Sequence, residues 1–246
     1  MAVSAAYAQT TPSLEDVLAQ VRSRVELYTA TLPNLFCDER FLSQRFNDGH
    51  QQETRTTVST FRVQRNPEHS DAARFRESRM VRQVDGMPAH GSRVQGPYTL
   101  DGGFDRALEL FTSARICFRF ALVSSPDPTR VRLSFEAKSP LPSDCPAADA
   151  GRSGTALIEA ANRQVLEMQE VLPHPQGGGN LWSPLRFSIT FAPVLLGGQT
   201  FYTPQTIQTR LEHRGTSEYL QSIAQYSNYH KLEVTSTIVP TPEGQP

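Results

Sequence analysis

The sequence predicts a mainly β fold of the α+β class: a half-barrel, in which a curved antiparallel sheet of about ten strands wraps over one long N-terminal helix. Two patterns predict it. Apolar residues recur at helical spacing near the N-terminus, and they alternate with polar residues in paired segments over most of the remaining chain. Strands that are apolar on one side must curl or stack, and the helix can cover that side. A two-sheet sandwich fits the strands but leaves the helix without a place.

The helix is predicted to begin at Leu14, after Ser13, which is a suitable N-cap residue. Pro33 is expected to end it. A second, short helix is predicted from Phe104 to Phe111, after the helix-breaking pair Gly102-Gly103. The apolar stripe of the long helix consists of Leu14, Val17, Leu18, Val21, Val25, Tyr28 and Leu32.

The first strands are expected near residues 35–46, 51–65 and 72–84, with a turn at Asn47-Asp48-Gly49. Segments 85–103, 139–152 and 173–184, which are rich in Pro and Gly, are interpreted as loops.

A clear hairpin surrounds Ser125-Pro126-Asp127-Pro128, with apolar residues alternating from Ile116 to Leu122 and from Val131 to Ala137. If Ser124 pairs with Thr129, then Phe118 lies opposite Phe135 and Phe120 opposite Leu133. The other face of this hairpin is polar and is expected to meet water.

Two more hairpins follow. Ala156 and Ile158 are expected to pair with Met168 and Leu166 across a turn at 161–163. Across Gly197-Gly198, the residues Leu185, Ile189 and Leu195 are expected to face Leu211, Ile207 and Phe201. Gly215 then turns the chain into a last stretch that ends with Leu232, Val234 and Ile238.

One domain is expected over residues 13–240, followed by a disordered tail at 241–246. Residues 1–12 are interpreted either as the remnant of an export signal or as a disordered start. Ala6, Tyr7 and Ala8 form the small-x-small pattern of a signal-peptidase site, although the basic start and long apolar run of a full signal are missing.

Several segments resemble a group of uncharacterised secreted bacterial proteins. They are LAQVRSRVELYTATLPNLFCDE, GGFDRALELFTSARICFRF, GTALIEAANRQVLEMQ, GGQTFYTPQTIQTRLEHRG and YSNYHKLEVTSTI. That group is similar in fold to the periplasmic lipoprotein carriers, the LolA/LolB-like half-barrels. The resemblance implies a periplasmic or secreted protein with an apolar cavity, whose relatives bind lipid groups or serve as sensor domains for envelope stress. It rests on fold and not on functional residues, so any function carried over from it is an analogy.

The apolar inner face is the first candidate site, and ordinary core beneath the helix is the alternative interpretation. Its ligand-binding candidates are Phe118, Phe120, Leu133, Phe135, Met168, Phe187 and Phe191. A second candidate is an anion or lipid-headgroup patch of Arg74, Arg76 and Arg82, in a cluster that also includes Arg79. The alternative there is a solvated strand face that protects a sheet edge from aggregation.

A disulfide is predicted between Cys117 and Cys145, with Cys37 buried and unpaired. In the predicted register Cys117 lies opposite Glu136 on the outer face, and the Pro-rich loop after Lys138 can bring Cys145 back over that face. The alternative is three free thiols.

No motif indicates an enzyme, a metal site or a cofactor. The six histidines are isolated, and Ser153 in GRSGT lacks the nucleophile-elbow pattern. A net charge of −1 gives no general attraction to nucleic acid, and no apolar run is long enough for a membrane-spanning segment. Three hypotheses remain: a binding protein for a lipid or lipoprotein acyl chain, an interaction or sensor module for another envelope protein, and, more distantly, a hydrolase.

Overall fold

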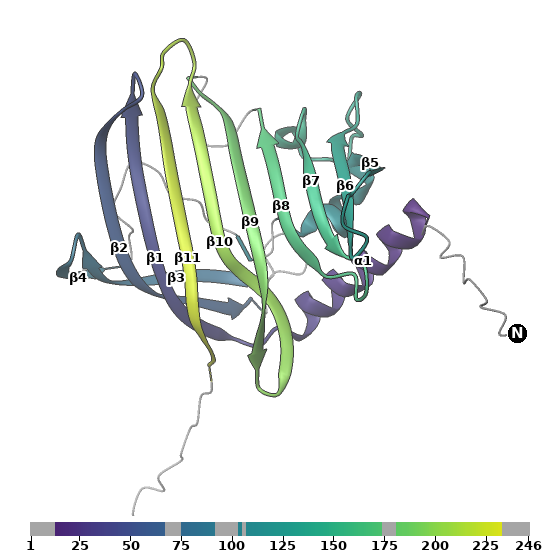
Figure 1. The fold of residues 1–246 in the computed structure, drawn as a ribbon, viewed down its shortest axis with the longest axis horizontal. Coiled ribbons are helices and arrows are strands. Elements are labelled where there is room, and N and C mark those ends of the chain that lie inside the picture. The colour runs from purple at the N-terminus through teal and green to yellow at the C-terminus, as the bar shows by residue number, and fades with distance from the viewer. Residues whose placement is uncertain (1–12, 67–74, 92–102, 105–106, 174–180, 233–246) are drawn as a thin grey trace, which may run out of the picture.

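The computed structural model describes residues 13–66, 75–91, 103–104, 107–173 and 181–232. Within these ranges the fold class is confirmed: one helix and one curved antiparallel sheet of eleven strands, in the order β4-β3-β2-β1-β11-β10-β9-β8-β7-β6-β5 (Figure 1). The elements are α1 (Leu14–Thr31), β1 (Leu35–Asn47), β2 (His50–Arg65), β3 (Phe75–Val84), β4 (Met87–Gly91), β5 (Phe118–Val123), β6 (Arg130–Ala137), β7 (Ser153–Glu159), β8 (Val165–Leu172), β9 (Trp182–Leu196), β10 (Gln199–His213) and β11 (Tyr219–Lys231).

Helix α1 forms as the sequence predicts. The Ser13 hydroxyl accepts a hydrogen bond from the Asp16 backbone N–H at 3.1 Å, which caps the first turn. At the other end, the guanidinium of Arg65 in β2 donates to the carbonyl oxygens of Thr29, Ala30 and Leu32 at 2.8–3.0 Å. A cation on these unpaired carbonyl groups stabilises the helix end and fastens it to the sheet.

A single row of buried apolar residues crosses seven strands and defines the inner face of the sheet. Each of its members lies opposite the next in register and is at most 4% exposed. The row consists of Leu133, Ala156, Met168, Ile189, Ile207, Ala224 and Phe41. Because the sheet is apolar on this face only, it curls around the elements that cover the row.

Two elements cover the inner face. The buried stripe of α1, which includes Val17, Val21 and Val25, packs on one part of it. Residues 103–104 and 107–117 pack on another, with Phe104 and Phe111 at most 1% exposed. A Cβ atom on Gly103 would lie 2.2 Å from Cδ1 of Ile207, so this backbone rests directly on the apolar row.

The predicted helix from Phe104 to Phe111 is wrong. Residues 105–106 lie outside the described ranges, and the chain then forms two short 3-10 helices, η1 (Glu109–Phe111) and η2 (Ser113–Cys117). A regular helix would bury a single stripe, whereas here consecutive residues such as Leu110 and Phe111 are both buried. The tighter, irregular backbone therefore brings more of this segment into the core.

The register predicted for the β5–β6 hairpin is wrong by two residues. Phe120, not Phe118, lies opposite Phe135, and Phe118 lies opposite Ala137. The connection is longer than expected because Oδ1 of Asp127 accepts hydrogen bonds from the backbone and the hydroxyl of Thr129, which forms a local turn. A shift of two leaves the side chains of β5 and β6 on their predicted faces.

The β9–β10 hairpin follows its predicted register only in part. Leu185 pairs with Leu211 and Ile189 with Ile207, as expected. Beyond the bulge that follows Pro204, Leu195 pairs with Thr200 instead of Phe201 and is 70% exposed. Proline has no N–H to donate to the ladder, which favours a bulge here and moves the following residues by one position.

A bulge also changes the β7–β8 hairpin. Ala156 pairs with Met168 as predicted, but Ile158 pairs with Val165 and not with Leu166. Segment 85–103, interpreted as a loop, contains the strand β4, and β9 begins inside the predicted loop 173–184. Asp85 and Gly86 both have positive φ, as a two-residue hairpin turn requires, so the Asp-Gly pair was the signal for β4. Val234 and Ile238 lie outside the described residues.

One ion pair is buried at the β1–β3 side of the inner face. Nε of Arg79 donates to both carboxylate oxygens of Glu39, at 2.9 and 3.0 Å, and Glu39 is fully buried. The guanidinium also lies 4.7 Å from the ring centre of Phe61. Because both charges are removed from water, each depends on the other.

We expect Glu39→Ala to lower the free energy of unfolding by about 3–5 kcal/mol, since it removes the fully buried carboxylate to which the buried Arg79 donates. Arg82→Gln is the matched control: its ion pair with Asp38 at 2.5 Å is exposed, and its loss should cost about 1 kcal/mol or less. Urea unfolding followed by circular dichroism measures both. Equal effects would contradict this account of the pair.

Candidate functional site

A groove lies between the N-terminal half of α1, η2 and the edge strand β5; we call it the α1–β5 groove. Its volume is about 380 Å³, within the range of small-molecule pockets. It is lined by Leu14, Glu15, Leu18, Arg22, Thr112, Arg115, Ile116, Phe118, Phe120 and Lys138. The groove exists because β5 is the last strand of the sheet and no further strand covers the space between it and α1.

Apolar side chains form the floor of the groove. Leu18 and Phe118 are each 3% exposed, whereas Phe120 is half-buried and Ile116 is 53% exposed. The ring of Phe120 stacks on that of Phe111 and contacts that of Phe118, with centres 6.0 and 6.5 Å apart. This floor provides a preformed surface for an alkyl or aromatic group.

Cations outnumber acids on the walls. Arg22, Arg115 and Lys138 line the groove together with one carboxylate, Glu15, and Arg22 also donates to Glu26 at 2.7 Å. Arg115 donates to Glu15 at 2.9 Å, but that carboxylate is 79% exposed, so the pair contributes little to stability. Lys138 has no ion-pair partner among the described residues. An apolar floor with cationic walls suits a molecule that has an apolar part and an anionic group.

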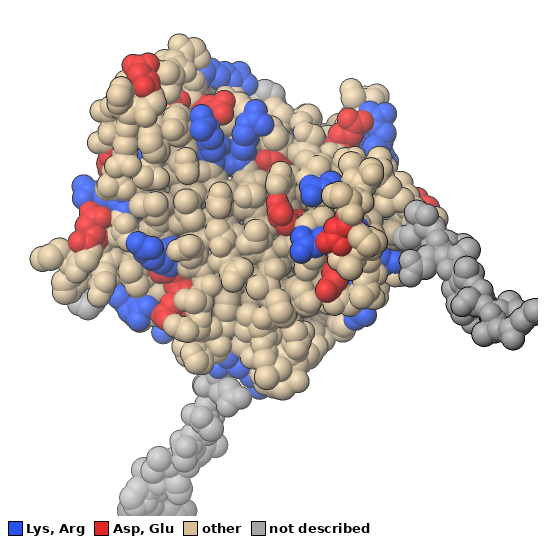
Figure 2. All heavy atoms as spheres, in the orientation of Figure 1, with Lys and Arg blue, Asp and Glu red and all other residues tan. Residues whose placement is uncertain are grey.

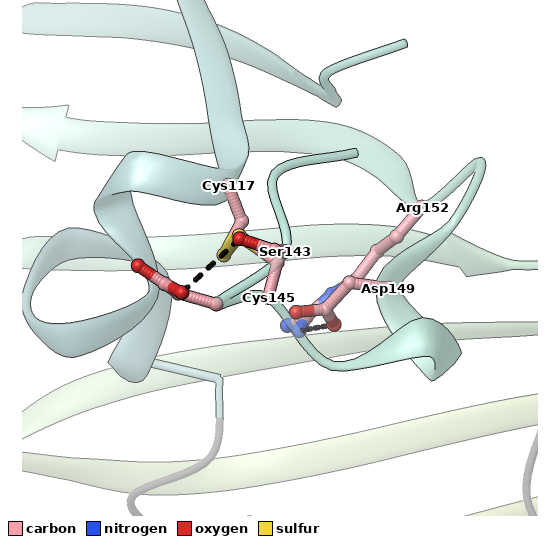
Figure 3. Close-up of a disulfide and its surroundings, with 6 residues drawn as sticks. Cys117, Ser143, Cys145, Asp149 and Arg152 are labelled. Atoms are coloured by element: carbon pink, nitrogen blue, oxygen red, sulfur yellow. Dashed lines mark hydrogen bonds and ion pairs between the residues drawn. A yellow bond between two sulfur atoms is a disulfide. The ribbon is translucent and has the colours of Figure 1, made fainter. Parts of the chain in front are cut away.

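A disulfide fixes the wall of the groove. Cys117, which lies between the lining residues Ile116 and Phe118, is bonded to Cys145, with the two Cα atoms 5.7 Å apart (Figure 3). The predicted route to this bond is wrong, however, because Cys117 lies in η2 and is buried in the core instead of pointing to the outer face. Cys37 is buried and free.

A buried group of charges lies beside the disulfide. Arg152 donates to Glu170 at 2.6 Å and to Asp149 at 3.1 Å, and its guanidinium lies 5.4 Å from the ring centre of Phe118 (Figure 3 shows the contact with Asp149). Burial raises the pKa of the Glu170 carboxyl, although the charge of Arg152 opposes that rise. These contacts hold Phe118, and with it the floor of the groove, in one position.

The structure brings only part of the predicted apolar site into the groove. Phe118 and Phe120 line it. Leu133, Phe135, Met168 and Phe191 are buried in the core, at most 7% exposed, and Phe187 is half-buried against the same core. Helix α1 and the described residues of 103–117 pack against the same core, so these five residues do not line the groove.

The cations of the groove were not singled out from the sequence. Arg22 lies on the helix, Arg115 precedes β5 and Lys138 follows β6. No spacing links three positions so far apart in the chain. The sequence offered one weak signal: Arg115 and Lys138 lie at the two outer ends of the apolar β5–β6 hairpin. Basic residues are common at such positions in any soluble protein, so the signal is not specific.

Two residues of the predicted arginine patch, Arg76 and Arg82, lie on the outer face of β3. Arg74 lies outside the described residues. Arg79 points to the inner face and pairs with Glu39, and Arg82 pairs with Asp38 on the outer face. Arg76 is exposed on β3. Because a strand alternates its side chains between the two faces, Arg79 does not belong to the surface that carries Arg76 and Arg82.

Within the described ranges, no group of three or more His, Cys, Asp or Glu side chains is placed to hold a metal ion. In the same part of the chain, no helix has the length and apolar character needed to cross a bilayer.

No protein-family model matches the sequence, and no curated protein matches it. Among solved structures, the chain is similar to a DUF1329 family protein from Desulfovibrio piger, with 11% identity, a TM-score of 0.41, and coverage of 92% of this chain and 96% of that chain. It is also similar to a LolA superfamily protein from Nitrosomonas europaea, with 9% identity, a TM-score of 0.37, and coverage of 92% and 96%.

The sequence resembles a group of proteins that is similar in fold to the LolA/LolB-like carriers. A LolA superfamily protein is among the structural neighbours of the chain. A third similar structure is MucB in complex with MucA(peri), with 11% identity, a TM-score of 0.23, and coverage of 87% of this chain and 94% of that chain. With TM-scores below 0.5, none of the three supports an inference about the ligand or partner of this chain. That inference rests on the groove.

We expect no thiol of the native protein to react with a water-soluble thiol reagent, and one to react after denaturation without reductant. Burial, followed by the nearby charge of Glu39, raises the pKa of Cys37, so its thiol stays protonated at neutral and mildly basic pH. Peptide mapping should identify the reactive residue as Cys37. Three reactive thiols in the denatured protein would exclude the disulfide.

Proposed function

We propose that this protein is a non-enzymatic binding protein of the bacterial envelope that holds an anionic amphiphile, such as a fatty acid or a lipid acyl chain with its head group, in the α1–β5 groove. The observation that carries the proposal is the combination of an apolar floor, formed by Leu18, Phe118 and Phe120, with the cationic walls formed by Arg22, Arg115 and Lys138. The apolar part of the ligand would lie on the rings and its anionic group would meet the cations.

The envelope location is also proposed. A Cys117–Cys145 disulfide is stable in an oxidising compartment such as the periplasm, and the small-x-small pattern at residues 6–8 favours export.

A second candidate function is an interaction or sensor module without a small ligand. The filled centre of the inner face favours it, because Phe104, Leu110 and Phe111 are buried where an open half-barrel would hold its ligand. The two functions make different demands on the groove: the binding protein requires it to admit an alkyl chain, whereas the module does not.

We expect a fluorescent fatty acid to bind the wild-type protein saturably. The double variant Arg115→Glu/Lys138→Glu should bind it about tenfold more weakly or worse, because charge reversal repels the carboxylate. The matched control is Arg119→Glu, which reverses a cation on the adjacent strand β5 that is 59% exposed and pairs with Glu136 on the outer face. Fluorescence titration measures all three proteins.

Phe120→Arg is a second variant that places a charge on the apolar floor, and it should abolish binding while circular dichroism stays unchanged. Native mass spectrometry of protein purified from envelope extract should show the added mass of a bound lipid. Absence of saturable binding by the wild-type protein would reject the binding function and leave the interaction module.

A further inference from the structure

A second hollow lies on the outer face of the sheet, which faces away from α1. It has a volume of about 450 Å³ and extends over β7–β11; we call it the outer hollow. The residues that matter for its chemistry are Gln169, Arg186, Ser188, Gln208, Arg210 and Gln221. Their inward neighbours in sequence, including Ile189, Ile207 and Leu211, belong to the buried side, so these six side chains all project to the outside.

Two arginines lie directly opposite each other in the outer hollow. Arg186 on β9 pairs in register with Arg210 on β10, and their side chains are 54% and 45% exposed. Like charges at opposite positions destabilise a sheet. One carboxylate, Glu212, lies 3.2 Å from Arg210 and 3.9 Å from Arg186, so a single negative charge faces two positive ones. Figure 2 shows basic side chains gathered over the upper parts of β9 and β10, with an acidic side chain among them.

Arg210 is also held in place from its other side. Its guanidinium lies 3.8 Å from the ring centre of Tyr219, which is a close cation–π contact. A guanidinium that is already oriented loses less conformational freedom when it binds an anion in bidentate geometry.

Amide and hydroxyl groups continue the outer hollow next to the arginines. Gln169, Ser188 and Gln208 form a row in register across β8, β9 and β10, and Gln221 lies opposite Arg210 on β11. Glutamine side chains both donate and accept hydrogen bonds, as the hydroxyl groups of a sugar do. With only two cations and several amides, the outer hollow suits a small polar anion better than a long polyanion.

We propose that the outer hollow binds an anionic saccharide, a sugar that carries a phosphate or a carboxylate group. Arg186 and Arg210 bind the anionic group, and Gln169, Gln208 and Gln221 bind the hydroxyl groups. Glu212 competes with the ligand for the same two guanidinium groups. This site is separate from the α1–β5 groove, and its existence does not depend on the function proposed for that groove.

The test is a titration of ¹⁵N-labelled protein with glucose 6-phosphate, glucuronate and glucose, followed by NMR. We expect saturable shifts of the backbone amide signals of residues 186–188 and 208–210 with one or both anionic sugars, and at least tenfold weaker binding of glucose. The tighter of the two anionic sugars identifies the anionic group. The double variant Arg186→Gln/Arg210→Gln should weaken binding about tenfold or more, since it removes both charged donors.

Glu212→Gln provides the opposite test, because removal of the competing carboxylate should strengthen binding several-fold. Its matched control is Glu136→Gln, which neutralises an exposed acid on the outer face of β6, outside the hollow. No saturable shift with either anionic sugar, or weaker binding by Glu212→Gln, would overturn the proposal. Inorganic phosphate binding as tightly as glucose 6-phosphate would refute its saccharide part.

Discussion

One-sided burial of the sheet is the constraint on which the rest of the structure depends. The row from Leu133 to Phe41 crosses seven strands with no more than 4% exposure, while its sequence neighbours on each strand point to the other face of the sheet. At about 25 cal/mol per Å² of apolar surface, a row of this length cannot be left in water. The sheet therefore curls over α1 and the 103–117 segment, and the shape of the molecule follows from how far those two elements extend. These elements do not fill the space beside the edge strand β5, and that space is the α1–β5 groove.

Among the described residues, the charged side chains buried in this apolar interior are paired. Arg79 with Glu39, and Arg152 with Glu170 and Asp149, lie toward opposite edges of the sheet, at β1–β3 and at β7–β8. In both places an arginine also lies over a phenylalanine ring, Phe61 or Phe118. Such groups contribute little net stability compared with apolar residues of the same size, but each restricts its neighbours to one arrangement. The second group is functionally interesting because Phe118 forms the floor of the groove and Cys117, next to it, is tied to Cys145.

The two faces of the sheet are suited to different ligands. The groove on the inner side combines aromatic rings with cations and is closed on one side by a helix, so it suits a molecule that is partly apolar. Among the described residues no helix covers the outer hollow, and its lining combines amides, hydroxyls and arginines with Val171 and Phe187. A single sheet can carry both because alternate residues of each strand face opposite sides. Residues of β7 and β8 between the two sites, such as Glu170, are buried and paired, which keeps the backbone that both sites share in a fixed position.

The sequence by itself determined the long helix, the antiparallel hairpins and the side of each strand that is buried, because periods of 3.6 and 2 residues are local properties of the chain. The sequence also predicted which two cysteines form the disulfide, because Cys145 closely follows the strand that pairs with the region of Cys117. The pairing register of the strands, and the way other elements cover the sheet, were decided only in the tertiary structure. The Asp127 turn moved the β5–β6 pairing by two residues, and the bulge after Pro204 moved Leu195 into solvent. The cations of the groove come from a helix, a 3-10 helix and the end of a strand, and their proximity arises only when the sheet curls and brings these three elements together.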